Sequence, residues 1–275
     1  MTEKPPPSSD IVRKGFAPVN GLNLYFEIHG AGRPLVLLHG GLGGAGVMFG
    51  DLIPRLADGR QVIGVDLQAH AHTADIDRPF SWEGFAEDVA GLIRYLGLER
   101  ADLMGYSLGG GVALRTALSH PEVTRRLVLV SAPCRRRGWY PEVLEGMAAM
   151  TAEAASGMAG SPLHAAYVRV APRPEDWPLL VAKTGELLQR EYDWCGELAG
   201  IRMPVMVVVG DADSIPPAHA AEMFALLGGG KGDAGWDGSR RPESRLAILP
   251  GTTHYNSFAS PLLAPAVISF LDEPA

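Results

Sequence analysis

Cysteine and excess positive charge are both scarce in this chain of 275 residues. The two cysteines, Cys134 and Cys195, are too few for a disulfide framework, so we expect each to be a free, packed thiol. Lys and Arg total 24 against 31 Asp and Glu, which gives a formal net charge of −7. No face shows the clustered Lys and Arg that a phosphate backbone requires, so we expect no nucleic-acid partner.

Long apolar runs, targeting signals and metal-binding spacings are also missing. No segment reaches eighteen uninterrupted apolar residues, so we expect no membrane span and no membrane partner. The N-terminal sequence lacks the apolar core of a secretory signal, and residues 1–14 are expected to be a disordered leader. Together with free thiols, this predicts a cytoplasmic location. There is no C-x-x-C or H-E-x-x-H motif, and we expect neither a metal nor a cofactor.

Continuously apolar runs separated by helix-length segments dominate the rest of the chain. They occupy residues 34–40, 60–67, 100–107, 125–133, 203–211 and 244–251. Such runs are typical of parallel strands that are covered on both faces. An Asn20-Gly21 turn predicts an antiparallel hairpin ahead of the first of them. The expected fold class is therefore α/β, with a mostly parallel, doubly wound sheet.

The regular alternation stops between residues 134 and 200. No strand-like run occurs there, and the composition turns to Ala, Met, Glu and aromatic residues. We expect a helical insertion over one edge of the sheet, which divides the core into 15–133 and 201–275. A glycine-rich stretch at 228–243 predicts a surface loop.

The glycine-rich turn after the first parallel strand allows two interpretations. Gly41, Gly43 and Gly46 fit the G-x-G-x-x-G pattern, and Asp66 follows at the spacing of a dinucleotide-binding fingerprint. The same turn starts His39-Gly40-Gly41, which could instead form an oxyanion hole.

Two features of the flanking sequence favour the oxyanion hole. A hairpin precedes the glycine turn, whereas a dinucleotide fold normally begins with the fingerprint strand. Gly50 and Pro54 also interrupt the segment where a pyrophosphate-binding helix would run.

The candidate nucleophile is Ser107, in the G-x-S-x-G stretch at 105–109 between a strand and a helix. A tight turn there would project the serine above the sheet, and the two glycines would allow the backbone to pass closely. The helix that begins at Leu108 would direct free N–H groups at the reaction centre.

A serine nucleophile needs a base and an orienting acid. His254 follows the last predicted strand and is the expected base. Asp211 and Asp213 both follow an earlier strand, and we favour Asp213 because Asp211 is better suited to the turn itself. The resulting Ser–Asp–His order is that of an α/β-hydrolase.

The stretches "LVLLHGG", "GYSLGGG", "GDAD" and "PGTTH" together resemble the α/β-hydrolase superfamily, specifically its small bacterial esterase-like members. The resemblance covers essentially the whole chain after the leader and implies that 134–200 is the family's cap. It also implies an oxyanion hole formed by the N–H groups of Gly41 and Leu108. One departure is Ala69-His70-Ala71-His72, where the family usually has G-H-G, since alanine restricts the path of that loop.

The sequence therefore predicts a serine hydrolase that cleaves small to medium apolar or aryl carboxylic esters through an acyl-enzyme. The candidate pocket residues are Leu42, Tyr106, Trp139, Tyr140, Met147 and Trp177. Lactone hydrolysis, carbon–carbon bond hydrolysis and cofactor-free perhydrolysis use the same triad and remain open. A ligand receptor that keeps the fold but hardly turns over is the alternative from another class. The oligomeric state is left open.

Overall fold

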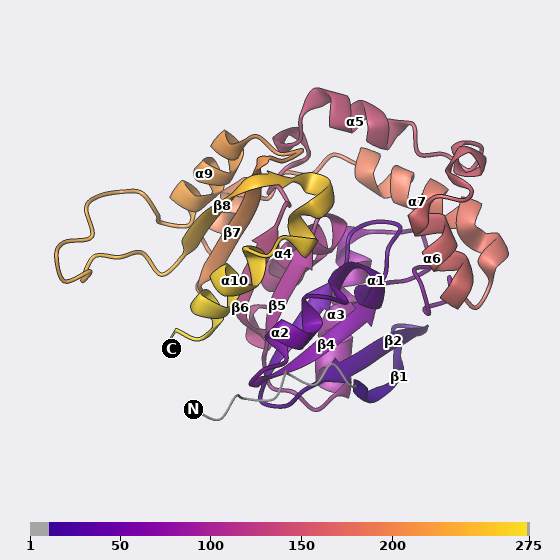
Figure 1. Cartoon of the computed structure of the whole chain (residues 1–275), viewed down its shortest axis with the longest axis horizontal. Coiled ribbons are helices and arrows are strands. Elements are labelled where there is room, and N and C mark those ends of the chain that lie inside the picture. Colours follow the sequence, from indigo (N-terminus) through magenta and orange to yellow (C-terminus); the bar gives the residue numbers. More distant parts are fainter. Residues whose placement is uncertain (1–10, 274–275) are drawn as a thin grey trace.

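An eight-stranded sheet forms the centre of the molecule (Figure 1). The structure is a computed structural model, and it describes residues 11–273. The strands are β1 (Ile11–Val19), β2 (Leu22–His29), β3 (Arg33–Leu38), β4 (Arg60–Asp66), β5 (Ala101–Tyr106), β6 (Thr124–Val130), β7 (Val205–Ala212) and β8 (Arg245–Thr253). They follow the order β1-β2-β4-β3-β5-β6-β7-β8, and every pair from β4 onward is parallel. The predicted α/β class with a mostly parallel sheet is confirmed.

The N-terminal hairpin forms as the Asn20-Gly21 pair predicts. Both residues have positive φ, 48° and 78°, as a two-residue hairpin turn of the primed type requires. β1 begins at Ile11, so residues 11–14 are strand and not part of a leader; residues 1–10 of the expected leader lie outside the described residues. Between residues 11 and 273, no helix is long and apolar enough to cross a membrane.

Helices cover both faces of the sheet, and each face has its own apolar cluster. One cluster contains side chains from α3 (Trp82–Tyr95), α4 (Leu108–Ser119) and α9 (Pro217–Leu226). The other contains side chains from α1 (Ala45–Phe49), α2 (Ile53–Leu56) and α10 (Leu263–Leu271). Successive residues of β3 alternate between these clusters, which explains why the strand is apolar throughout.

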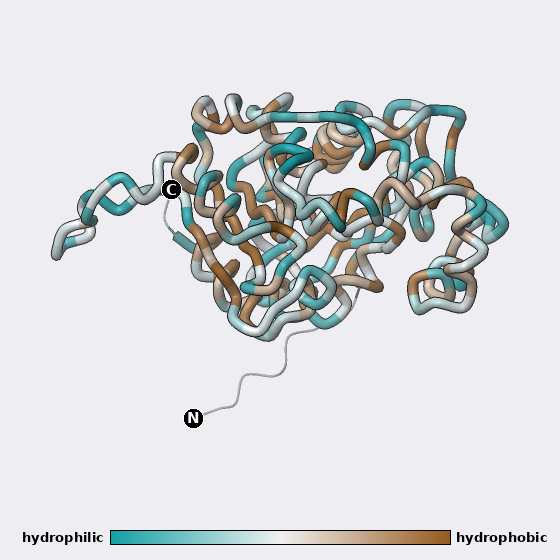
Figure 2. Tube along the Cα trace, turned by 90° about the horizontal axis from the view of Figure 1, so that it is seen from above, coloured by the Kyte–Doolittle hydropathy of each residue, from teal (hydrophilic) through white to brown (hydrophobic). Residues whose placement is uncertain are grey.

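The segment from 134 to 200, which we call the cap segment, contributes no strand to the sheet. Its helices are α5 (Pro141–Ala148), α6 (Pro162–Val170), α7 (Trp177–Gln189) and α8 (Cys195–Leu198). Figure 1 shows α5, α6 and α7 grouped beyond one end of the sheet. The glycine-rich segment 228–243 projects away from the body on the opposite side and is largely polar (Figure 2).

The two ends of the cap segment are held together by a disulfide between Cys134 and Cys195. Their Cα atoms lie 5.2 Å apart although 61 positions separate them in the sequence. The backbone N–H of Trp194 also donates to the carbonyl of Cys134 at 2.9 Å. The prediction of two free thiols is therefore wrong, and the cytoplasmic location loses the support that it drew from them.

The loop after β4 adopts a path that suits glycine better than the residues present. Ala69 and Ala71 have φ of 63° and 44°, in the left-handed region. Both alanines and the intervening His70 are buried. The loop thus retains a glycine-type conformation despite the alanines, and packing must offset the steric cost.

Candidate active site

Ser107 lies at the junction between β5 and α4, where the chain turns sharply. Its φ of 54° is unusual for a residue with a side chain, and its backbone N–H donates to the Val130 carbonyl on the neighbouring strand at 2.9 Å. A strained turn of this kind projects a nucleophile above a sheet. The side chain is also only partly buried, so a substrate has access to it.

The glycines on either side of Ser107 are required by close backbone contacts. A Cβ atom on Gly105 would lie 2.1 Å from the Gly109 carbonyl oxygen, and one on Gly109 would lie 2.2 Å from the Leu38 carbonyl oxygen. No side chain fits at either distance. The geometric reason predicted for the G-x-S-x-G pattern is therefore confirmed.

These contacts give a stability prediction. We expect Gly109→Ala to lower the free energy of unfolding by about 3 kcal/mol, because backbone atoms must move to admit the methyl group. Gly146→Ala is the matched control. Nothing lies within 4 Å of a Cβ there, and the substitution should raise stability by about 0.5–1 kcal/mol. Urea denaturation of the three proteins provides the measurement, and equal midpoints would contradict the argument.

A hydrogen-bonded chain links Ser107 to His254 and Asp213. His254 Nε2 lies 3.1 Å from Ser107 Oγ, and His254 Nδ1 lies 3.0 Å from Asp213 Oδ1. His254 comes from the 3-10 helix η5 (His254–Ala259), directly after β8, and Asp213 follows β7. The structure thus brings together the three residues predicted from the sequence. His254 contacts both Ser107 and Asp213, as a base that is oriented by an acid would.

The carboxylate of Asp213 is held in place by further donors. Ser131 Oγ donates to its Oδ2 at 2.6 Å, and the N–H groups of Gly210 and Ser214 donate at 3.0 and 2.7 Å. Burial alone raises the pKa of Asp213, but hydrogen bonds from His254 and Ser131 contribute to a net lowering. The carboxylate is therefore ionised at neutral pH, as stabilisation of a charged imidazole requires.

Asp211, the alternative acid, has a different environment. Its side chain is exposed, and its Oδ1 accepts from the backbone N–H of Thr252 at 3.1 Å. That contact joins β7 to the end of β8, which is the structural turn role expected for it.

Ser131 was not anticipated from the sequence. It follows β6, has a φ of 51°, and lies between Asp213 and Ser257, whose Oγ is 3.0 Å away. Only tertiary structure brings it to the acid, so no local pattern identifies it.

Removing the Ser131 hydroxyl should weaken the orientation of the acid. A hydrogen bond to a charged group contributes about 1.5–3 kcal/mol. For the predicted ester hydrolysis, we therefore expect Ser131→Ala to lower kcat roughly tenfold with little change in KM. Ser119→Ala, at the exposed end of α4, is the control and should leave both constants unchanged. An unaltered kcat in Ser131→Ala would show that the other donors suffice.

The turn after β3 lies against the start of α4. A Cβ on Gly41 would be 3.7 Å from Leu108 Cδ1 and 3.3 Å from Thr184 Cγ2 of α7. The two predicted oxyanion-hole residues are therefore neighbours, and the cap segment covers them. Thr184 is a further buried residue at this position that the sequence did not suggest.

A buried histidine fixes the orientation of this turn. His39 Nδ1 lies 2.8 Å from the Gly40 carbonyl oxygen, and its Nε2 accepts from the Leu67 N–H at 3.1 Å. Burial lowers the pKa of His39, which keeps the ring neutral as this pairing requires. In a trans peptide the C=O and N–H groups point in opposite directions. Because the Gly40 carbonyl faces the His39 ring, the Gly41 N–H points away from that ring.

The candidate pocket residues divide between the site and the protein interior. The Trp139 ring lies edge-on to His254 at 5.3 Å, and the backbone N–H of Tyr140 donates to the Ser214 carbonyl at 3.1 Å. Leu42, with a φ of 62°, is buried in the same apolar cluster as Leu108. Met147 is half-buried on α5.

Two of the candidates have structural positions instead. Trp177 is buried inside the cap segment, where its Nε1 donates to the Ala155 carbonyl at 3.3 Å. Tyr106 is also buried, and its hydroxyl donates to the His254 carbonyl at 2.8 Å. Trp177 therefore packs within the cap segment, and the Tyr106 hydroxyl supports the backbone of His254.

Asp66, the acidic residue of the dinucleotide-binding pattern, is buried and bonded to other protein groups. Asp66 is buried; its Oδ1 accepts from the Ala45 N–H at 2.9 Å, and its Oδ2 lies 2.8 Å from His72 Nδ1. The helix after the glycine turn, α1, is only five residues long. This geometry disfavours a ribose-binding role for Asp66 and agrees with the oxyanion-hole interpretation of the turn.

A cavity of about 500 Å3 lies beside the candidate triad rather than over it. Its lining includes Met48, His72, Arg169 and Phe258, but not the three triad residues. The Phe258 ring in the cavity wall packs against the Tyr106 ring, with 5.0 Å between the ring centres. Tyr106 in turn bonds the backbone of His254, so this wall lies next to the candidate site. The cavity therefore adjoins the candidate site but does not contain the triad.

Comparison with known proteins places the chain in a family. Residues 33–172, half of the chain, match the family model for the alpha/beta hydrolase fold, and the chain belongs to that family. RutD from Azorhizobium caulinodans, which is assigned as a carbamate hydrolase, is 29% identical over 229 residues, covering 74% of this chain and 82% of the relative.

Two further similarities involve different named activities. The 2-hydroxymuconate semialdehyde hydrolase of Pseudomonas sp. strain CF600 is 35% identical over 117 residues, which is 41% of each chain. The crystal structure of the enol-lactonase from Burkholderia xenovorans LB400 has a TM-score of 0.70 at 23% identity, covering 94% of this chain and all of that one. These similarities support a hydrolase, and they do not select the bond that it cleaves.

Proposed function

We propose that this protein is a serine hydrolase that cleaves carboxylic esters through an acyl-enzyme intermediate. The observation that carries the proposal is the continuous relay from Ser107 Oγ through His254 to Asp213, with contacts of 3.1 and 3.0 Å. The relay begins at a residue with positive φ that is accessible at the end of the central sheet. These contacts support the proposed roles of nucleophile, base and acid in acyl transfer.

The reaction proceeds in two halves. His254 takes the proton of Ser107 as the serine oxygen attacks the ester carbonyl, and then gives that proton to the departing alcohol. The N–H groups of Gly41 and Leu108 stabilise the negative charge on the carbonyl oxygen, each contributing about 3–4 kcal/mol. Water activated by His254 then releases the acid and restores the serine.

The proposed substrates are small to medium apolar or aryl esters. The proposal is supported by the apolar character of the residue that faces the base, Trp139, and by the cap segment that covers the oxyanion turn through Thr184. Water exclusion by such a cover strengthens the electrostatic stabilisation of the transition state.

Steady-state hydrolysis of p-nitrophenyl acetate, butyrate and octanoate tests the proposal directly, alongside a panel of lactones and vinylogous diketones. Ester turnover that exceeds turnover of the other substrates supports the proposal, and the chain-length profile then measures the pocket. Turnover of only a lactone or diketone would replace the ester by that bond. Labelling of Ser107 by a fluorophosphonate without turnover of any substrate would favour a receptor.

A further inference from the structure

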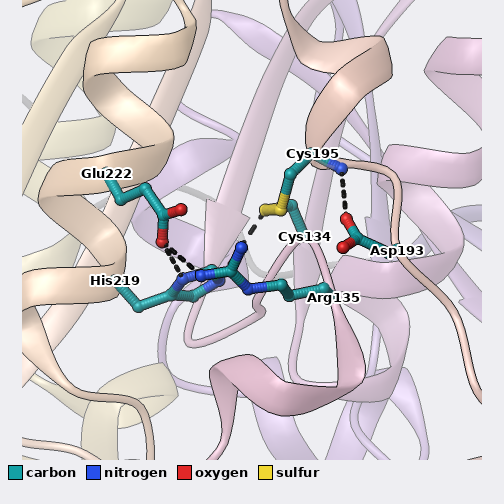
Figure 3. Close-up of a disulfide and its surroundings, with 6 residues drawn as sticks. All are labelled: Cys134, Arg135, Asp193, Cys195, His219 and Glu222. Atoms are coloured by element: carbon teal, nitrogen blue, oxygen red, sulfur yellow. Dashed lines mark hydrogen bonds and ion pairs between the residues drawn. A yellow bond between two sulfur atoms is a disulfide. The ribbon is translucent and has the colours of Figure 1, made fainter.

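The disulfide at the ends of the cap segment has an unusual neighbour. His219 Nε2 of α9 lies 3.7 Å from Cys134 Sγ, and the imidazole is buried (Figure 3). The Sγ atoms of Cys134 and Cys195 and the nearest ring nitrogen all lie within 4.8 Å of one another. Three soft or borderline ligands thus converge on one buried point outside the candidate active site.

The ring is oriented so that its lone pair faces the sulfur atoms. His219 Nδ1 lies 2.9 Å from Glu222 Oε2, so this nitrogen is the one that carries the proton. With the proton on Nδ1, the lone pair of Nε2 is directed toward Cys134 Sγ at 3.7 Å and can act as a ligand. A carboxylate bonded to the remote ring nitrogen is the usual support of a metal-bound histidine.

The distances and charges suit a thiophilic divalent cation. In a tetrahedral site with Zn–S near 2.3 Å and Zn–N near 2.0 Å, sulfur and nitrogen lie about 3.5 Å apart, close to the 3.7 Å between Cys134 Sγ and His219 Nε2. Two thiolates neutralise the cation, and the nearby Arg135 and Glu222 form their own ion pair at 2.7 Å. The assembly therefore carries no uncompensated buried charge.

We propose that in the dithiol state Cys134, Cys195 and His219 bind one Zn²⁺ ion, with Glu222 supporting the histidine. Disulfide formation consumes both thiolate ligands and so prevents zinc binding. A dithiol reductant supplies two electrons to the disulfide and becomes a cyclic disulfide itself, leaving two thiols. Zinc binding then forms two Zn–S bonds and one Zn–N bond and releases the two thiol protons. A water molecule completes the tetrahedron. The metal would join the same two ends of the cap segment that the disulfide joins.

The first test uses Co²⁺ as a spectroscopic probe of the full-length protein. One sample is oxidised, and the other is reduced with dithiothreitol and freed of reductant under argon. We expect only the reduced sample to develop sulfur-to-cobalt charge-transfer bands and intense tetrahedral d–d bands, at one ion per chain, and Zn²⁺ to bleach them. No charge-transfer band after reduction, or equal bands in the oxidised sample, would overturn the proposal.

Variants identify the ligands and their support. His219→Gln should weaken Zn²⁺ binding to the reduced protein by at least about 100-fold, and Glu222→Gln by about 10–100-fold. His120→Gln is the matched control, since that histidine also pairs with a glutamate, Glu87, at 3.1 Å but lies apart from the cysteines. Equal affinity in His219→Gln and in the control would refute the three-ligand site.

A melting experiment covers the case in which reduction or substitution loosens the fold. Zn²⁺ should raise the Tm of the reduced wild type by several degrees and leave the Tm of the oxidised protein unchanged, because only the dithiol state binds the ion. Cys195→Ser, which cannot form the disulfide, should gain a smaller shift than the reduced wild type. The absence of any zinc-dependent shift in the reduced wild type would overturn the proposal.

Discussion

Ser107→Ala should abolish nearly all ester hydrolysis, with a fall in kcat of about 10⁵–10⁶. The side chain is the proposed nucleophile, and its Oγ lies 3.1 Å from the only proposed base, His254 Nε2. Alanine removes the attacking atom of the proposed nucleophile and should keep the strained turn, so the N–H groups of the proposed oxyanion hole should stay in place. Residual catalysis from binding and those N–H groups should be the remaining rate.

The measurement separates chemistry from binding and folding. Active-site titration with a fluorophosphonate should label one serine per wild-type chain and none in Ser107→Ala. Ser119→Ala, on the exposed end of the same helix, should retain wild-type kcat and labelling. Circular dichroism should show that all three proteins are folded. Substantial activity in Ser107→Ala would mean that another residue is the nucleophile and would refute the proposed mechanism.

Much of the fold could be predicted because its determinants are local in sequence. A strand that is covered on both faces must be apolar throughout, and the runs around β3 to β7 have that property, whereas β8 at the sheet edge is largely exposed or half-buried. The nucleophile turn is equally local, since Gly105 and Gly109 are required by backbone contacts at fixed spacing from Ser107. The expected order of serine, acid and histidine along the chain then limits the acid and base to residues that follow the later strands.

Features that depend on distant contacts could not be predicted. Cys134 and Cys195 are 61 positions apart, and they meet only in the folded chain, where the Trp194 N–H also donates to the Cys134 carbonyl. The sequence around an aromatic residue such as Trp177 does not distinguish a residue that lines a pocket from one that packs inside the cap segment. Only the structure shows where its side chain lies. Ser131 reaches Asp213 from the loop that follows β6, a contact that neither residue's neighbours in the sequence indicate.

The choice between the two carboxylates yields the second large effect. Asp213→Asn should lower kcat by about 10⁴, because the amide NH2 can donate to His254 Nδ1 and hold the wrong tautomer, and a neutral amide does not stabilise the charged imidazole as a carboxylate does. Asp211→Asn should change kcat less than about threefold, since the exposed side chain accepts from backbone N–H groups at the end of β8 and makes no contact with His254.

The size of the loss relative to Ser107→Ala distinguishes an orienting role from a chemical one. Asp213→Asn retains the nucleophile, so it should keep more activity than Ser107→Ala and should still be labelled slowly by a fluorophosphonate. Its remaining activity should rise with pH, as a weakly oriented histidine is assisted by hydroxide. A dead Asp211→Asn beside an active Asp213→Asn would assign the acid to residue 211, against the 3.0 Å contact between Asp213 and His254.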